Sequence, residues 1–161
     1  MRIDKTNYYL DIAQVVAERG TCLRRKFGAV IVKNDTIIST GYAGAPRGRK
    51  NCCDIGTCLR QKLEIPAGER YELCRSVHAE ANAIISASRE EMIGSVLYLC
   101  CIDPEGEVVG GTDCCSMCRR LIINAGIDRV VVRDTKTEFH TVDVNKDWVE
   151  IDDSLEDKRG Y

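Results

Sequence analysis

The sequence predicts an α/β fold in which one mixed β-sheet carries helices on both faces. Two β-rich runs, at residues 27–32 and 36–42, are separated by Asn34 and Asp35, a pair typical of a tight turn, and they predict an antiparallel hairpin. In the second half of the chain strand-like and helical segments alternate, which favours parallel strands joined by crossover helices. The length of 161 residues suits a single domain, 1–161, with one core.

The other elements follow in order along the chain. Residues 7–19 place apolar side chains at helical spacing and stop at Gly20, which predicts the first helix. After the hairpin, residues 43–75 form an irregular stretch rich in Cys and Arg, and a loop of that length in a small domain is usually functional. We then expect a helix over 78–88 capped by Ser76, a strand over 96–102, a Gly-rich loop over 103–113, a helix over 115–125 ending at Gly126, strands over 129–132 and 142–144, and an acidic tail over 145–161.

Composition narrows the classes of function. Hydrophobic residues make up 44% and charged residues 30% of the chain, as in ordinary globular proteins. No apolar run approaches the roughly 20 residues needed to cross a bilayer. The start of the chain is polar and lacks the apolar core of a signal peptide. We therefore expect a cytoplasmic protein without a membrane partner.

Charge is unevenly spread around a net value of −2, which gives no bulk attraction to nucleic acid. Residues 19–75 hold twelve Lys and Arg against five Asp and Glu, whereas residues 134–161 hold nine Asp and Glu against four Lys and Arg. Solvated faces would account for this distribution. The sharper hypothesis is that some positive charges of the middle segment meet a small anion such as a phosphate.

Ten cysteines are present, and in a reducing compartment such a number indicates metal or thiolate chemistry rather than disulfides. Cys100 and Cys101 lie in an apolar strand-like run, where we interpret them as core residues. The others stand at positions 22, 52, 53, 58, 74, 114, 115 and 118.

One pattern carries recognisable metal chemistry. His78 opens a predicted helix, and Cys115 and Cys118 open a later one. Cysteines at i and i+3 lie on one face of a helical turn, where they can bind one metal ion, and the positive helix ends favour thiolate over thiol. One imidazole and two thiolates make three ligands, the number typical of a catalytic zinc site that leaves a position for water. Zinc lowers the pKa of such a water to about 7.

Glu80 stands two residues beyond His78, close to the metal but not needed as a ligand. Its carboxylate can take a proton from water and deliver it to a leaving amine. H-x-E followed by C-x-x-C is the signature of zinc-dependent nucleobase deaminases, in which the Glu is the acid and base. Two alternatives are a redox C-x-x-C and a zinc-stapled interaction module. The second predicts four protein ligands and leaves Glu80 unexplained.

At this point the sequence resembles the deoxycytidylate deaminases of the zinc-dependent cytidine/deoxycytidylate deaminase family. The resemblance runs from about residue 9 to residue 144, and it rests on CLRRKFGAV at 22–30, GYAGAP at 41–46, SVHAEANAI at 76–84, and the C-x-x-C leading into LIINAG at 121–126. It implies a three-layer fold with a five-stranded sheet. It also implies hydrolysis of dCMP to dUMP and ammonia by an oligomer, often a hexamer. Some members respond to a triphosphate effector with Mg²⁺.

Two positions depart from the family pattern. Cys114 stands where the family usually has Pro, which adds a thiol beside the ligand Cys115. Ala43 stands where the family usually has an Asn that approaches the substrate sugar. Other free cytosine nucleotides or nucleosides therefore stay open as substrates. A base within RNA or DNA is a further alternative, but two Phe and one Trp offer little stacking surface for a nucleic-acid strand.

The resemblance also places the turn at 41–46 near the nucleotide. We expect Arg24, Arg47 and Arg49 to bind its phosphate, because a guanidinium matches phosphate bidentately; exposed solubilising charges are the alternative for each. Ala43 and Ala79 are the remaining candidate substrate contacts.

A second, structural zinc site is expected at four cysteines outside the catalytic pattern: Cys22, Cys52, Cys58 and Cys74. Such a cluster would tie residues 43–75 to the base of the active site, and a structural zinc contributes folding energy directly. Cys53 is an alternative to Cys52, since the sequence does not distinguish adjacent residues. Four reduced thiols without a metal are the competing interpretation.

Overall fold

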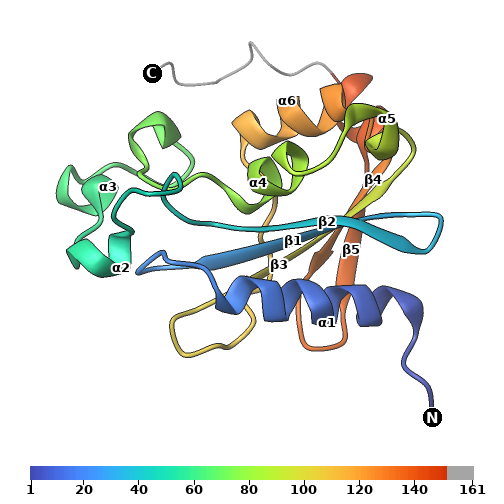
Figure 1. Ribbon diagram of the computed structural model, residues 1–161, viewed down its shortest axis with the longest axis horizontal. Coiled ribbons are helices and arrows are strands. Elements are labelled where there is room, and N and C mark those ends of the chain that lie inside the picture. The colour runs from blue at the N-terminus through green and yellow to red at the C-terminus, as the bar shows by residue number, and fades with distance from the viewer. Residues whose placement is uncertain (152–161) are drawn as a thin grey trace.

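The computed structural model describes residues 1–151 and consists of a five-stranded sheet between helices (Figure 1). The strand order is β2-β1-β3-β4-β5, with β1 at Lys26–Lys33, β2 at Thr36–Tyr42, β3 at Val96–Ile102, β4 at Arg129–Arg133 and β5 at Phe139–Asp143. β3 and β4 are parallel, and the other neighbouring strands are antiparallel. The predicted hairpin and mixed five-stranded sheet are therefore confirmed.

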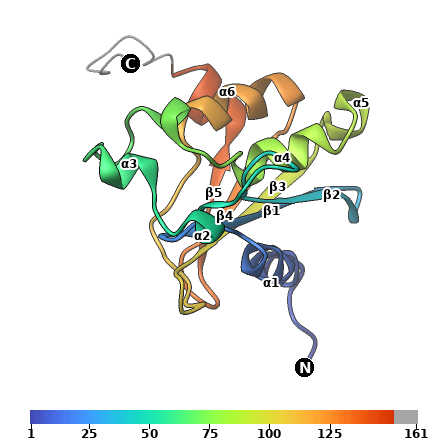
Figure 2. The same cartoon turned by 60° about the vertical axis from the view of Figure 1, so that its left-hand side comes forward.

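Helices cover both faces of the sheet, as predicted. α1 (Lys5–Glu18) packs on one face, and α4 (Ala79–Ile85), α5 (Arg89–Met92) and α6 (Ser116–Ala125) pack on the other (Figure 2). Successive strand residues face opposite sides. Val30 and Cys100 accordingly pack with α1, whereas Ile31 and Leu99 pack with α4 and α6. Cys100 and Cys101 are both fully buried, as expected of core residues.

Two glycines allow helices to touch the sheet backbone. A Cβ atom on Gly28 of β1 would lie 2.2 Å from the carbonyl oxygen of Ala13 in α1. A Cβ atom on Gly41 of β2 would lie 2.4 Å from the backbone nitrogen of Ala83 in α4. Any larger residue would push these helices away, so Gly41 fixes the height of α4, and of the residues at its start, above the sheet.

Helix boundaries differ from the prediction in two places. The helix expected over 78–88 has His78 as its N-cap residue, not Ser76, because the chain stays extended through His78, and it ends at Ile85. Ser88 caps the separate α5 by accepting a hydrogen bond from the Glu91 backbone nitrogen. The stretch 43–75 contains three short helices: α2 (Cys52–Ile55), α3 (Leu59–Lys62) and the 3₁₀ turn η1 (Tyr71–Leu73). These single turns depend on local caps, such as the reciprocal pairing of Asn51 and Asp54, which hydrophobic periodicity does not reveal.

The last strand lies earlier than predicted. β5 begins at Phe139, opposite Arg133 of β4, and it ends at Asp143, whose side chain caps the π-helical turn η2 (Val144–Val149). Pairing with β4 across a short turn, rather than the apolar content of residues 142–144, sets this position. Residues 152–161 of the predicted acidic tail lie outside the described residues. Within residues 1–151, no helix is both long enough and apolar enough to span a membrane.

Candidate active site

Two helix N-termini meet on the same face of the sheet and bring the predicted metal ligands together. His78 is the N-cap residue of α4, and Cys115 is the N-cap residue of α6. Cys118 lies in the first turn of α6 and is buried. The Nδ1 atom of His78 lies 3.4 Å from the sulfur of Cys115 and 3.5 Å from that of Cys118. We call these three residues the metal triad.

The metal triad fits a zinc ion. Its three ligand atoms all lie within 4.8 Å of one another, and within residues 1–151 it is the only group of three or more His, Cys, Asp or Glu residues this compact. One imidazole and two sulfurs are a donor set that suits zinc, and three protein ligands are the number found in catalytic sites. The triad thus has the ligand count and the spacing that the sequence predicts.

The side chains of the metal triad shift one another's pKa values. A hydrogen bond with Cys115, and a weaker contribution from Cys74, raise the pKa of His78 to about 10. A hydrogen bond from Cys118 lowers the pKa of Cys115 to about 4, with His78 adding to the effect. Zinc binds neutral imidazole and thiolate, so its binding displaces these protons, and acid weakens it.

Glu80 lies beside the metal triad, one residue into α4. Its side chain is buried, and its Oε2 atom accepts a hydrogen bond of 3.3 Å from the Cys118 thiol. Burial raises the pKa of the carboxyl group, and the opposing influence of His78 only reduces that rise. A raised pKa makes the carboxylate a stronger base, which suits a group that accepts a proton and returns it.

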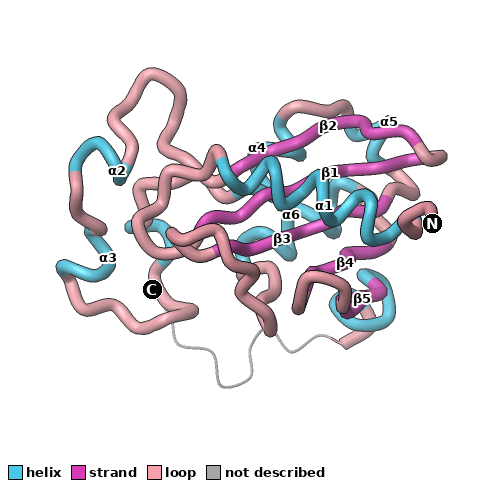
Figure 3. Tube along the Cα trace, turned by 90° about the horizontal axis from the view of Figure 1, so that it is seen from below, coloured by secondary structure: helices cyan, strands magenta, loops and turns pink. Residues whose placement is uncertain are grey.

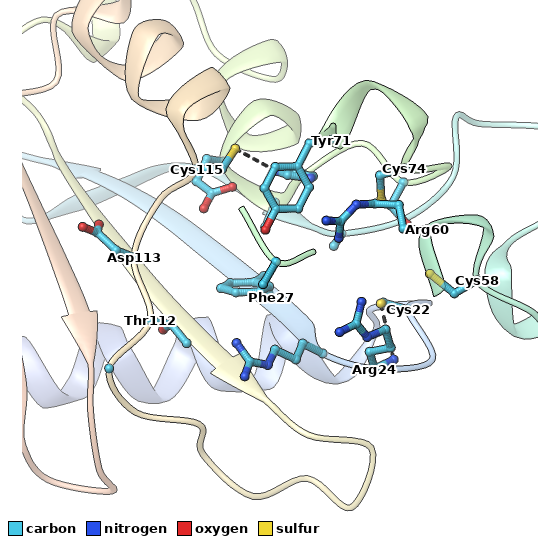
Figure 4. A pocket seen from close by; sticks show the side chains of 18 residues that line it. Cys22, Arg24, Phe27, Cys58, Arg60, Tyr71, Cys74, Thr112, Asp113 and Cys115 are labelled. Carbon is cyan, nitrogen blue, oxygen red and sulfur yellow. Dashed lines mark hydrogen bonds between the residues drawn. The ribbon is translucent and has the colours of Figure 1, made fainter. Parts of the chain in front are cut away.

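A pocket of about 360 Å³ opens above these residues (Figure 4). His78, Glu80 and Cys115 line it, together with Ala79 and Ala43. The two alanines expected to contact the substrate therefore do belong to the cavity wall. A cavity of this size lies within the range of small-molecule sites.

Aromatic side chains from separate segments form part of the wall. Phe27 comes from β1 and Tyr71 from the 3₁₀ turn η1. The Tyr71 ring meets the His78 ring edge-on, with centroids 5.3 Å apart. The Arg60 guanidinium stacks 4.3 Å from the centre of the Tyr71 ring and donates hydrogen bonds to the carbonyls of Pro66 and Glu69. The stretch 43–75 therefore closes one side of the pocket.

The arginines near the pocket differ from those expected. Arg24 does line it, but Arg47 and Arg49 do not. They lie on an exposed turn, closed by a hydrogen bond from the Arg49 nitrogen to the Pro46 carbonyl, and this turn runs outside the pocket wall. Arg25 and Arg60 line the pocket instead. Arg25 is adjacent to Arg24 in the CLRRKFGAV segment and could have been found there, whereas no local pattern in the sequence marks Arg60.

The four cysteines Cys22, Cys52, Cys58 and Cys74, which we call the outer cysteines, gather near the same pocket. Three of them line it, and Cys52 is buried in α2 while Cys53 is exposed. Burial raises the pKa of Cys52, and the neighbouring three thiols add to that rise. Within residues 1–151, however, the outer cysteines do not bring three ligand atoms as close together as the metal triad does. They are neighbours, but they do not form a closed donor set.

Cys114 is not part of the metal triad, because its side chain lies in the hydrophobic core. It is buried in the core cluster with α4 and α6, and burial raises the pKa of its thiol well above the usual value. The adjacent Cys115 points to His78 instead. The x-x spacing therefore identified the correct member of the pair.

Comparison with known proteins gives a consistent match. The family model for the cytidine and deoxycytidylate deaminase zinc-binding region matches residues 3–134. The deoxycytidylate deaminase of Mycobacterium phage D29 is 38% identical over 135 residues, covering 81% of this chain and 94% of that protein. The deoxycytidylate deaminase of Schizosaccharomyces pombe is 33% identical over 125 residues, covering 78% of this chain but only 35% of that protein.

A solved structure shares the fold. The dCMP deaminase of cyanophage S-TIM5, in complex with dCMP and dUMP, superposes with a TM-score of 0.58 at 26% identity, covering 84% of this chain and 85% of that chain. A cytidine deaminase from Burkholderia pseudomallei, 17% identical with a TM-score of 0.55 and covering 89% of this chain and 94% of that chain, has the same fold.

Proposed function

The chain belongs to the cytidine and deoxycytidylate deaminase family, and we propose that it hydrolyses dCMP to dUMP and ammonia. One observation carries the proposal: His78 and Cys115 of the metal triad and the buried Glu80 carboxyl line a single pocket, which Arg24, Arg25 and Arg60 also line, with Cys118 buried directly behind it. A structural zinc module would need neither the carboxyl group nor the cavity. The cytosine base and the phosphate of the proposed substrate are taken from the names of the relatives, which are deaminases of deoxycytidylate.

The reaction adds water to C4 of the cytosine ring and expels the amino group as ammonia. His78, Cys115 and Cys118 would hold the zinc, which when bound supplies the positive charge that activates water at neutral pH. The helix N-termini at His78 and Cys115 favour the thiolate ligands through their dipoles.

Glu80 moves the protons. Its carboxylate accepts one from the attacking water and delivers it to the departing amine, so the carboxyl group returns to its starting state after each turnover. Two observations support this role. The Glu80 side chain is buried beside Cys118. Among the ion pairs of residues 1–151, none joins Glu80 to a Lys or Arg that would hold its charge.

The arginines of the pocket would bind the substrate phosphate. Arg24 and Arg25 line the pocket and are exposed, so they are free to approach an anion. Arg24 and Arg60 lie on the same side of the pocket (Figure 4). This assignment keeps the phosphate site expected from the sequence but moves it from Arg47 and Arg49 to Arg25 and Arg60. Ala43 leaves the sugar contact to other groups.

An absorbance assay with purified zinc-loaded protein tests the proposal. We expect loss of the cytosine absorbance with dCMP, and less efficient turnover of deoxycytidine, because deoxycytidine has no phosphate for the arginines to bind. CMP, dCTP and a cytosine-containing oligonucleotide complete the panel. Equal efficiency on deoxycytidine and dCMP would contradict the phosphate site, and inactivity on every cytosine substrate would contradict the proposed function.

Two further features belong to this proposal. The outer cysteines would bind a second, structural zinc if the stretch 43–75 closes around the ion, which the proximity of Cys52 to the other three supports. A homo-oligomer is supported by the apolar side chains of Ile85 and Leu121, which α4 and α6 leave 74% and 45% exposed. Light scattering tests the oligomer, and titration with a triphosphate and Mg²⁺ tests the effector that the resemblance implies.

A further inference from the structure

A short segment with no helix or strand of its own forms one wall of the pocket. We call residues 110–114 the strap. Gly111, Thr112 and Asp113 of the strap line the pocket, and the residue that follows the strap is the ligand Cys115. The position of the strap therefore affects both the cavity wall and the metal site, and something outside it must hold it in place.

One end of the strap rests on Asp134, which follows β4. The backbone nitrogen of Gly111 donates a hydrogen bond of 3.1 Å to Oδ1 of Asp134. A Cβ atom on Gly110 would lie 2.3 Å from the carbonyl oxygen of Asp134, so only glycine fits between the two segments. The loop after β3 and the β4–β5 turn come together at the lower edge of the molecule in Figure 2, where this hydrogen bond joins them. Figure 3 shows the same loops from below the sheet.

A residue of the neighbouring strand β5 holds the Asp134 carboxylate in place. His140 of β5 contacts both of its oxygens through Nδ1, at 2.8 Å and 3.0 Å. The backbone nitrogen of Asp134 donates to the carbonyl of Glu138, which closes the turn. The acceptor that receives the Gly111 hydrogen bond is thus fixed from two sides, although Asp134 itself does not line the pocket.

The other end of the strap is held from α6. Arg119 donates a hydrogen bond of 3.1 Å from Nε to the Cys114 carbonyl and pairs with the Asp113 carboxylate at 2.9 Å. Its guanidinium also stacks on Trp148 of η2, 5.1 Å from the ring centre. The strap is therefore clamped on both sides of Thr112.

Thr112 lies between the two clamps with an unused hydroxyl group. The residue is buried, it lines the pocket, and its Oγ1 atom has no hydrogen-bond partner within the part of the chain that the structure describes. A buried hydroxyl without a partner is unfavourable, and a polar ligand that supplies the partner gains the difference. A nucleotide in this pocket offers sugar and phosphate oxygens that can do so.

We propose that Asp134 is a positioning residue for the deamination: through Gly111 it fixes the strap so that the Thr112 hydroxyl meets the bound nucleotide. The proposal rests on the proposed function for the identity of the ligand. Arg119 still holds the end of the strap beside Cys115, so loss of Asp134 weakens nucleotide binding and leaves the metal triad and Glu80 in place.

The test compares Asp134→Ala, Asp134→Asn and Thr112→Val with Lys136→Ala, a matched change at an exposed residue of the same turn. In zinc-loaded protein we expect Asp134→Ala and Thr112→Val to raise the KM for dCMP about ten-fold, the scale of one lost hydrogen bond to a charged or buried group. The kcat should change much less. Asp134→Asn keeps an oxygen acceptor and should restore most of the binding, and Lys136→Ala should match the unmodified protein.

Amide hydrogen exchange supplies a readout independent of turnover. Exchange of the Gly111 amide should accelerate in Asp134→Ala but not in Thr112→Val. A KM within two-fold of the unmodified value in Thr112→Val would overturn the proposal, even if Asp134→Ala fails to fold. So would unchanged exchange at Gly111 in a folded Asp134→Ala. If the unmodified protein processes no cytosine substrate, the proposed function fails, and this result is distinct from an unaltered KM in an active enzyme.

Discussion

The metal triad and the outer cysteines contain the same kinds of donor atom, but the fold holds them differently. The triad stands at the starts of two helices that pack on one face of the sheet, and its ligand atoms lie within 4.8 Å of one another. The outer cysteines stand in or beside the stretch 43–75, whose helices are single turns, and their sulfurs do not converge to that degree within residues 1–151. Preformed geometry therefore depends on anchoring to the sheet more than on the number of thiols.

The largest effect is expected at the triad itself. His78→Ala removes the only imidazole of the set, and two thiolates alone are a poor site for a catalytic zinc. We expect loss of both bound zinc and activity, measured by elemental analysis and by the dCMP assay. Cys53→Ser, at an exposed thiol beside the outer cysteines, is the matched control and should keep both. If His78→Ala still held one zinc ion per chain at the triad, the imidazole would not be needed to bind the metal.

Glu80→Gln separates binding of the metal from proton transfer. The substitution keeps the shape of the side chain but removes its acid and base function, which contributes about 10²–10⁴-fold to rate. Turnover should fall by at least about that factor while zinc content stays at the unmodified level. Near-normal kcat in this variant would show that another group moves the protons.

Zinc stoichiometry then sharpens the contrast between the two regions. If the stretch 43–75 closes around an ion, fully active protein should carry about two zinc ions per chain, because tetrahedral sites of four Cys are a common structural type. Cys58→Ser should reduce this to about one and lower the melting temperature, with the triad still occupied. A value near one in active, unmodified protein would show that the outer cysteines remain free thiols.

The smallest effect is expected at the two cysteines of β3. Burial raises the pKa of Cys100 to about 11 and that of Cys101 to about 12. The reactive thiolate forms only as pH approaches these raised values, so raising the pH from 7 to 9 should leave both thiols unmodified by a maleimide in folded protein. Cys53 should react over the same range. Peptide mapping would detect labelling of Cys100 or Cys101, which would show that β3 opens.

The sequence predicted those parts of the site that local spacing determines. His78 and Glu80 stand at the start of α4, and Cys115 and Cys118 at the start of α6, so the beginning of each helix brings one pair together. Helices on both faces and the parallel β3–β4 pair follow from the alternation of elements. Each of these features depends on residues a few positions apart or on the order of elements.

The remainder depends on contacts that spacing does not encode. Arg60 reaches the pocket because α3 folds back on η1 and stacks its guanidinium on Tyr71. Arg47 and Arg49 are nearer in sequence to the expected turn but lie on its exposed side. The start of β5 is set by its pairing with β4, and the role of Thr112 depends on Asp134. Long-range packing decides all of these positions.

The placement of the ligands on two different helices has a consequence for folding. His78 and Cys118 are 40 residues apart in sequence, with all of β3 between them. An unfolded chain would have to close that loop before both could bind one ion, so the native state is the form that captures zinc. Zinc then shifts the folding equilibrium by mass action, by about 2.7 kcal/mol when free zinc is a hundred times its dissociation constant. The metal that serves the chemistry thereby also joins α4 to α6, and a chelator would lower the stability of the protein as well as its activity.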